Sequence, residues 1–178
     1  MEPLIRLLGN AEEPAEVRNA AAESLGALGD QRAVVALKEC LVDPKLSRQA
    51  VGALAKLQWS PQGPDERVRY LVARRDQPAL LAGWDDARKI LLADLKSADE
   101  KVSGNALRSL IGLGVPDTVP DLLQHLETVR SAKTGELYLN SGNEQLSKAA
   151  EAWAKRKGYT VMKFPMFGKG EATWGNMK

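Results

Sequence analysis

The sequence is poor in the residues that build most catalytic and metal sites. Its 178 residues include one cysteine, Cys40, and one histidine, His125. A single cysteine excludes an internal disulfide, and zinc sites ordinarily take several Cys and His ligands. The chain also lacks a phosphate-binding glycine loop and a paired-carboxylate signature. We therefore expect no enzyme activity, no catalytic residue, no cofactor and no metal site.

Long apolar runs and a strong net charge are missing as well. No stretch approaches the roughly 20 apolar residues that a membrane-spanning helix needs, so we expect no membrane partner. The formal net charge is only +2, which gives little overall attraction to nucleic acid. Because there is one cysteine and no signal-peptide pattern, the expected location is the reducing cytoplasm.

What the sequence does contain is a repeated segment. Residues 17–30 (VRNAAAESLGALGD) are partly repeated at 46–57 (LSRQAVGALAKL) and at 102–114 (VSGNALRSLIGLG). In the first copy, apolar and small residues recur three or four positions apart, which places them on one helical face. Repeats of this kind predict stacked units that share a continuous core.

The repeating unit is predicted to be a helix–turn–helix of about 29 residues, the distance from Val17 to Leu46. Gly29 is expected to end the first helix and Asp30 to cap the second, which Asp43 and Pro44 then terminate. Four alanines occupy equivalent first-helix positions, namely Ala21, Ala50, Ala106 and Ala150. The predicted second helices are 31–42, 84–96 and 117–128.

This pattern resembles HEAT repeats, in particular the short HEAT-like repeats first described in phycobilisome lyase subunits. The resemblance rests on Val17-Arg18, on the segment 25–30 (LGALGD), and on a leucine-rich second helix closed by Asp43-Pro44. It covers roughly residues 2–57 and 85–129. It implies an all-α fold, an α-solenoid of HEAT-like helical hairpins, with four or five units.

Three segments depart from the repeat. Residues 58–83 read as a degenerate repeat whose first helix spans 65–75 and pairs with the second helix at 84–96. Residues 130–143 read as a loop longer than a solenoid turn normally needs. At the start, Leu4 to Leu8 resembles a second helix without its first, which indicates either a short cap or a longer parent solenoid.

The expected organisation is a solenoid over residues 1–158 followed by a C-terminal tail, 159–178. The tail is expected to be irregular or β-containing, with an extended segment at 160–164 and a turn at 166–170. It is interpreted as a cap over the open end of the solenoid, since terminal repeats need covering. A mobile segment that meets a partner is the alternative.

Two sets of residues are candidates for an interaction surface. The second helices are predicted to line the concave side, with six exposed positions: Lys38, Glu39, Lys89, Lys96, Gln124 and Glu127. An arginine cluster flanked by two tryptophans is a second candidate, because Arg beside Trp is typical of interface hot spots: Arg67, Arg69, Arg74, Arg75, Trp59 and Trp84. The competing interpretation of this cluster is a solvated helix face.

Cys40, Asp94 and His125 occupy equivalent positions in different second helices. They could suggest a nucleophile, an acid and a base. However, neighbouring helices pack about 10 Å apart, whereas a nucleophile and its base must lie within hydrogen-bond reach. We therefore expect no catalytic set here, and we expect Cys40 to be a small core residue.

The leading functional hypothesis is a non-enzymatic scaffold that binds a protein partner through the concave face. The resemblance also implies an alternative, an accessory subunit of a bilin lyase, with a bilin held near Trp59, Trp84 and the arginines. Nucleic-acid binding is a weaker alternative, given the small net charge. The identity of the partner and the oligomeric state stay open.

Overall fold

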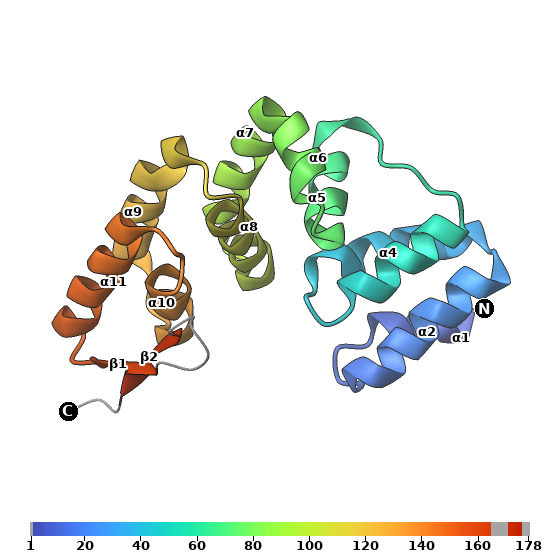
Figure 1. The fold of residues 1–178 in the computed structure, drawn as a ribbon. Helices are drawn as coiled ribbons and strands as arrows, with labels where there is room; N and C mark the ends of the chain where they lie inside the picture. Colours follow the sequence, from blue (N-terminus) through green and yellow to red (C-terminus); the bar gives the residue numbers. More distant parts are fainter. Residues whose placement is uncertain (1, 165–170, 176–178) are drawn as a thin grey trace.

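The computed structural model describes residues 2–164 and 171–175 and shows an all-α fold with a short C-terminal β-hairpin (Figure 1). The helices follow an arch from α1 at one end to α11 and the hairpin at the other. The described helices are α1 (Glu2–Gly9), α2 (Ala15–Leu28), α3 (Val34–Glu39), α4 (Ser47–Lys56), α5 (Gly63–Arg74), α6 (Gln77–Ala82), α7 (Trp84–Leu95), α8 (Glu100–Leu113), α9 (Val119–Thr128), α10 (Ala132–Leu139) and α11 (Glu144–Arg156). Short 3₁₀ turns flank some of them: η1 (Gln31–Ala33), η2 (Cys40–Val42) and η3 (Pro116–Thr118).

The first hairpin forms as its sequence predicts. Helix α2 buries Ala21, Ala22 and Leu25 and ends at Gly29, whose φ of 72° is the left-handed conformation that glycine adopts without steric cost. The Asp30 side chain then accepts a hydrogen bond from the backbone N–H of Arg32 at 2.9 Å and so caps the next turn. The predicted stop and cap are both confirmed.

The helices form two layers. Helices α2, α4, α6, α8 and α10 are the first helices of successive hairpins, and α3, α5, α7, α9 and α11 are the second helices. Within the first layer, α2 packs on α4, and α8 packs on α6 and α10. Within the second layer, α5 packs on η2 and α7, and α9 packs on α11. This pairwise packing confirms the predicted α-solenoid.

The prediction that helix 65–75 is the first helix of a hairpin with 84–96 is wrong. Helix α5 packs against α4 and is the second helix of that hairpin, whereas the first helix of the next hairpin is the six-residue α6. Pro64 lies in the first turn of α5, and the Asp76 side chain caps α6 by accepting from the backbone N–H of Ala79. The similarity of Val68-Arg69 to Val17-Arg18 is therefore misleading, since Val68 is a buried residue of a second helix.

The loop predicted at 130–143 is instead largely helix α10. Ser131 caps it by accepting from the backbone N–H of Thr134, and Tyr138 and Leu139 are buried in the core. Helix α10 packs on α8 and α11, while α11 packs on α9 and α10. Consequently α11 is a second helix, and the alignment of Ala150 with first-helix alanines is also wrong.

The buried side chains form two separate clusters rather than one continuous core. The first core joins α1 to α4 and includes Leu8, Leu25, Leu37 and Leu54. The second core joins α5 to α11 and includes Leu91, Leu110, Leu122 and Trp153. The two cores meet where α5 and α8 contact η2.

The C-terminal hairpin pairs β1 (Thr160–Phe164) with β2 (Glu171–Gly175) in antiparallel register, Thr160 opposite Gly175. Strand β1 packs against α11 and β2 against α10, and Tyr159 stacks on Trp153 with ring centroids 5.9 Å apart. This placement favours the interpretation of the tail as a cap. The turn predicted at 166–170 lies outside the described residues.

Candidate interaction surface

Ion pairs connect the second helices one after another. Lys38 on α3 pairs with Glu66 on α5. Arg69 on α5 pairs with Asp94 on α7 at 2.8 Å. From α7, Arg88 reaches Asp117 at 3.2 Å and Asp121 at 3.7 Å, at the start of α9. Glu127 on α9 pairs with Arg156 on α11 at 2.7 Å. Most of the charged side chains between neighbouring second helices therefore form ion pairs that hold these helices together.

The second helices also present outward stripes of exposed positions, one of which, Glu127, is paired with Arg156. The exposed positions are 85, 86, 89 and 93 on α7, followed by its C-cap residue Lys96, and 120, 124, 127 and 128 on α9. Among these, positions 85, 89, 93 and 96 and positions 120, 124 and 127 recur every three or four residues, which places each set along one side of its helix. The stripe on α7 mixes both charge signs, with Asp85 beside Lys89, and the stripe on α9 places the neutral Gln124 beside Glu127. Such a surface suits a protein better than a nucleic acid, which favours uniformly basic stripes.

The six positions predicted from the second helices divide into two groups. Glu39, Lys89, Lys96 and Gln124 are exposed and form no ion pair among the described residues. Lys38 is half-buried and paired, and Glu127 is exposed but paired with Arg156. The prediction that Lys38 is freely exposed is therefore wrong. We name the first group, Glu39, Lys89, Lys96 and Gln124, the second-helix surface.

The predicted arginine–tryptophan cluster does not assemble as one site. Trp59 packs on the first core and contacts Tyr70 edge-to-face at 5.5 Å, with Lys38 5.8 Å from its ring centroid. Trp84 instead packs on the second core. Sequence proximity alone suggested one cluster, but helices α5 and α6 separate the two tryptophans along the fold.

The four arginines of the predicted cluster lie in four different environments. Arg69 pairs with Asp94 and holds α5 to α7. Arg74 lies 5.6 Å from the Tyr70 ring centroid and 3.6 Å from Asp76. Arg67 is exposed on α5. Arg75 is the C-cap residue of that helix and lines the cleft described below.

Cys40, Asp94 and His125 also lie in different environments. Cys40 is buried in the first core, and burial raises the pKa of its thiol to about 11. Asp94 pairs with Arg69, and His125 hydrogen-bonds through Nδ1 to the Tyr138 hydroxyl at 2.5 Å. Burial lowers the pKa of His125 and raises that of Tyr138. Asp94 and His125 thus each contact a partner of their own, and Cys40 is a core residue, as expected.

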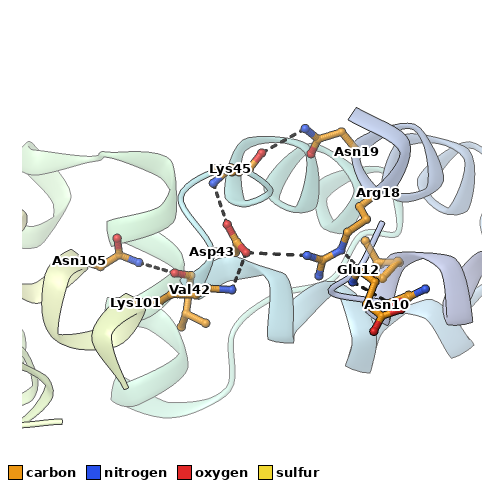
Figure 2. A network of polar contacts seen from close by, with 10 residues as sticks. Asn10, Glu12, Arg18, Asn19, Val42, Asp43, Lys45, Lys101 and Asn105 are labelled. Carbon is orange, nitrogen blue, oxygen red and sulfur yellow. Dashed lines mark hydrogen bonds and ion pairs between the residues drawn. The ribbon is translucent and has the colours of Figure 1, made fainter. Parts of the chain in front are cut away.

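A joint between the two cores is the polar site that sequence reasoning missed (Figure 2). Asp43 is nearly buried and accepts hydrogen bonds from Lys101 Nζ at 2.7 Å and from the backbone N–H of Lys45 at 2.9 Å. Arg18 Nη1 lies 4.0 Å away. One turn along α8 from Lys101, Asn105 Nδ2 donates to the Val42 carbonyl at 2.8 Å. The joint therefore ties α8 to the end of the first core.

The charge of Asp43 is stabilised by these partners. Burial alone would raise the pKa of this carboxyl, but the hydrogen bonds from Lys101 and Lys45 and the charges of Lys101 and Arg18 outweigh it and lower the pKa. Arg18 is fixed in turn, because its Nε donates to the Leu8 carbonyl at 2.8 Å. A buried carboxylate with several donors of this kind is structural.

Two further observations concern the described residues as a whole. Among them, no group of three or more His, Cys, Asp and Glu side chains could hold a metal ion. No helix within the described ranges combines the length and apolar character needed to cross a membrane.

The comparison with known families agrees with the fold. A family model described as HEAT repeats matches residues 1–55, which span α1 to most of α4. A search of curated proteins found no match. Repeat domains of this class typically offer extended surfaces to protein partners. Residues 1–55 are thus similar to HEAT repeats, and the hairpins that follow continue the all-α stacking of this segment.

Proposed function

We propose that this chain is a non-enzymatic scaffold that binds a protein partner through the second-helix surface. The observation that carries the proposal is the series of ion pairs that connects neighbouring second helices, while Glu39, Lys89, Lys96 and Gln124 stay exposed beside them. A surface that is fixed in shape before binding lowers the ordering cost of association. That these helices line the concave side stays a prediction.

The mixed charge of the surface points to the chemistry of the partner. Lys89 lies on α7 and Lys96 is the C-cap residue of that helix, seven positions further on, while Glu39 adds a negative charge on α3. A partner with complementary charges of both signs would fit, with charges at the rim setting the association rate. The accessory-lyase alternative needs Trp59, Trp84 and the arginines in one groove, and their separation leaves it without support.

The test is a pair of charge reversals with a matched control. Lys89→Glu and Lys96→Glu together should weaken partner binding at least about tenfold, because two rim charges change from attraction to repulsion. Lys56→Glu, at an exposed first-helix position on α4, should leave binding unchanged. Lys38 and Glu127 are unsuitable, since their reversal would break the α3–α5 and α9–α11 ion pairs.

The readout is quantitative affinity capture of interacting proteins, followed by binding measurements with the recovered partner. Far-ultraviolet circular dichroism should show unchanged helicity in both the double reversal and the Lys56→Glu control. Equal capture by the wild type and the double reversal would refute the assignment of the surface. Failure to recover any saturable protein ligand would refute the scaffold function itself.

A further inference from the structure

A cleft of about 310 Å³ lies at the junction between the two cores. Its walls come from the end of η2, the start of α4, the α5–α6 turn and α8. Its polar lining includes Ser47, Arg75, Gln77, Asn105, Arg108 and Ser109. None of these residues belongs to the second-helix surface, so the cleft is a separate feature of the molecule.

Two arginines define the charge of the cleft. Arg75 ends α5, and Arg108 projects from α8 into the same space. Among the described residues neither forms an ion pair. Burial and repulsion from Arg75 lower the pKa of Arg108, although a guanidinium keeps its proton at neutral pH. Two like charges thus face one space, and no carboxylate of the described residues forms an ion pair with either of them.

The nearby carboxylates are already engaged elsewhere. Asp76 follows Arg75 directly, but it caps α6 through Ala79 and lies 3.6 Å from Arg74. Asp43 is held by Lys101 and Arg18 in the joint. The positive charge in the cleft is therefore available to an external anion.

One guanidinium is also positioned in advance. Asn105 Oδ1 accepts from Arg108 Nη2 at 2.7 Å, while the amide nitrogen of Asn105 donates to the Val42 carbonyl (Figure 2). Asn105 thus links the Arg108 fork to the backbone of the first core. Leucine and valine side chains line the rest of the cleft, namely Leu41, Val72, Leu80 and Leu113.

We propose that this cleft binds an acidic peptide segment, with carboxylates of the peptide at Arg75 and Arg108 and an apolar side chain against the leucines. Guanidinium forks recognise carboxylates through paired hydrogen bonds. The apolar half of the lining favours a peptide over a bare anion, since an inorganic ion has no surface to bury there. The inference goes beyond the second-helix surface and does not depend on it.

The test measures binding of a fluorescein-labelled peptide of alternating Glu and Leu by fluorescence anisotropy. Arg75→Asn removes one charge while keeping a residue that tolerates the left-handed backbone, which has φ 57° at this position. Arg108→Gln retains a donor for Asn105. Each change should weaken binding about tenfold. Arg67→Gln, the same charge loss at an exposed site outside the cleft, should change it less than about twofold.

Three outcomes would overturn the proposal. Equal weakening by Arg67→Gln would show general charge attraction, and unchanged binding in both cleft variants would show that the peptide binds elsewhere. Equally tight binding of inorganic phosphate, measured by competition, would make the cleft a small-anion site instead. All of these measurements use the purified chain and a synthetic peptide, so their failure is distinct from failure of the second-helix surface to capture a partner.

Discussion

Two repeats approach each other closely at Gly26, and a single methyl group there should disrupt the stacking. A Cβ atom added to Gly26 would lie 2.7 Å from the Ala53 Cα and 2.9 Å from its Cβ. Ala53 is 2 % exposed and sits in the middle of α4, so it has no free space to move into. The backbones of α2 and α4 would have to separate to accept Gly26→Ala.

The expected loss of stability follows from two opposing terms. Overpacking a tight core costs about 1–3 kcal/mol. Replacing a helical glycine by alanine returns about 1 kcal/mol through helix propensity. Because the clash is with a backbone atom, we expect the upper part of the range, a net loss of about 1–2 kcal/mol, or roughly 2–8 °C in melting temperature for a chain of this size.

Gly52 provides the matched control, because it lies in α4 and a methyl group added there would meet no atom within 4 Å. Gly52→Ala should therefore stabilise the protein by up to about 1 kcal/mol. Urea unfolding followed by circular dichroism measures both variants. The reasoning would be refuted if Gly26→Ala were as stable as Gly52→Ala.

Three further predictions concern buried polar groups. Asp43→Ala should cost about 2 kcal/mol in urea unfolding, because it leaves the backbone N–H of Lys45 without its acceptor and the largely buried Arg18 side chain without its counter-charge, while the half-exposed Lys101 contributes little. Asp43→Asn should cost less, and an equal cost would contradict the role of the acceptor. Burial lowers the pKa of His125 in the folded chain, so between that pKa and 6.5 the unfolded chain binds more protons. The free energy of unfolding should therefore hold above pH 6.5 and fall as the pH drops from there through the folded-state pKa. His125→Gln should flatten this slope. Cys40, with its pKa raised to about 11, should react with a disulfide reagent far more slowly than free cysteine until urea unfolds the chain, and fast reaction of the folded protein would contradict its burial.

The features that could be predicted from the sequence are those that depend on residues close together in the chain. The first hairpin follows from residues within one turn of each other, such as Gly29 as a stop and Asp30 as a cap. Helix α10 was missed because Gly135 and polar neighbours hide its apolar residues, which gather only at 137–139. The pairing of α5 was misjudged because two residues, Val68-Arg69, resembled the start of a first helix.

The site features depended on contacts that no local pattern encodes. Lys101 reaches Asp43 from 58 residues away and Asn105 reaches Val42 from 63. The separation of Trp59 from Trp84 likewise follows from the division into two cores. By contrast, Glu39, Lys89, Lys96 and Gln124 were predicted correctly as exposed from helical periodicity, whereas Lys38 is half-buried because it pairs with Glu66 on a neighbouring helix.

Site-specific photo-crosslinking tests the central claim, partner binding by the second-helix surface, most directly. A photoreactive residue would replace Lys89 or Gln124 on the second helices and, as the control, Lys56 on α4, all three of them exposed. The account predicts that both second-helix positions crosslink to the same protein partner and that the α4 position does not. Crosslinking of that partner from Lys56 alone, or equally from all three positions, would contradict it.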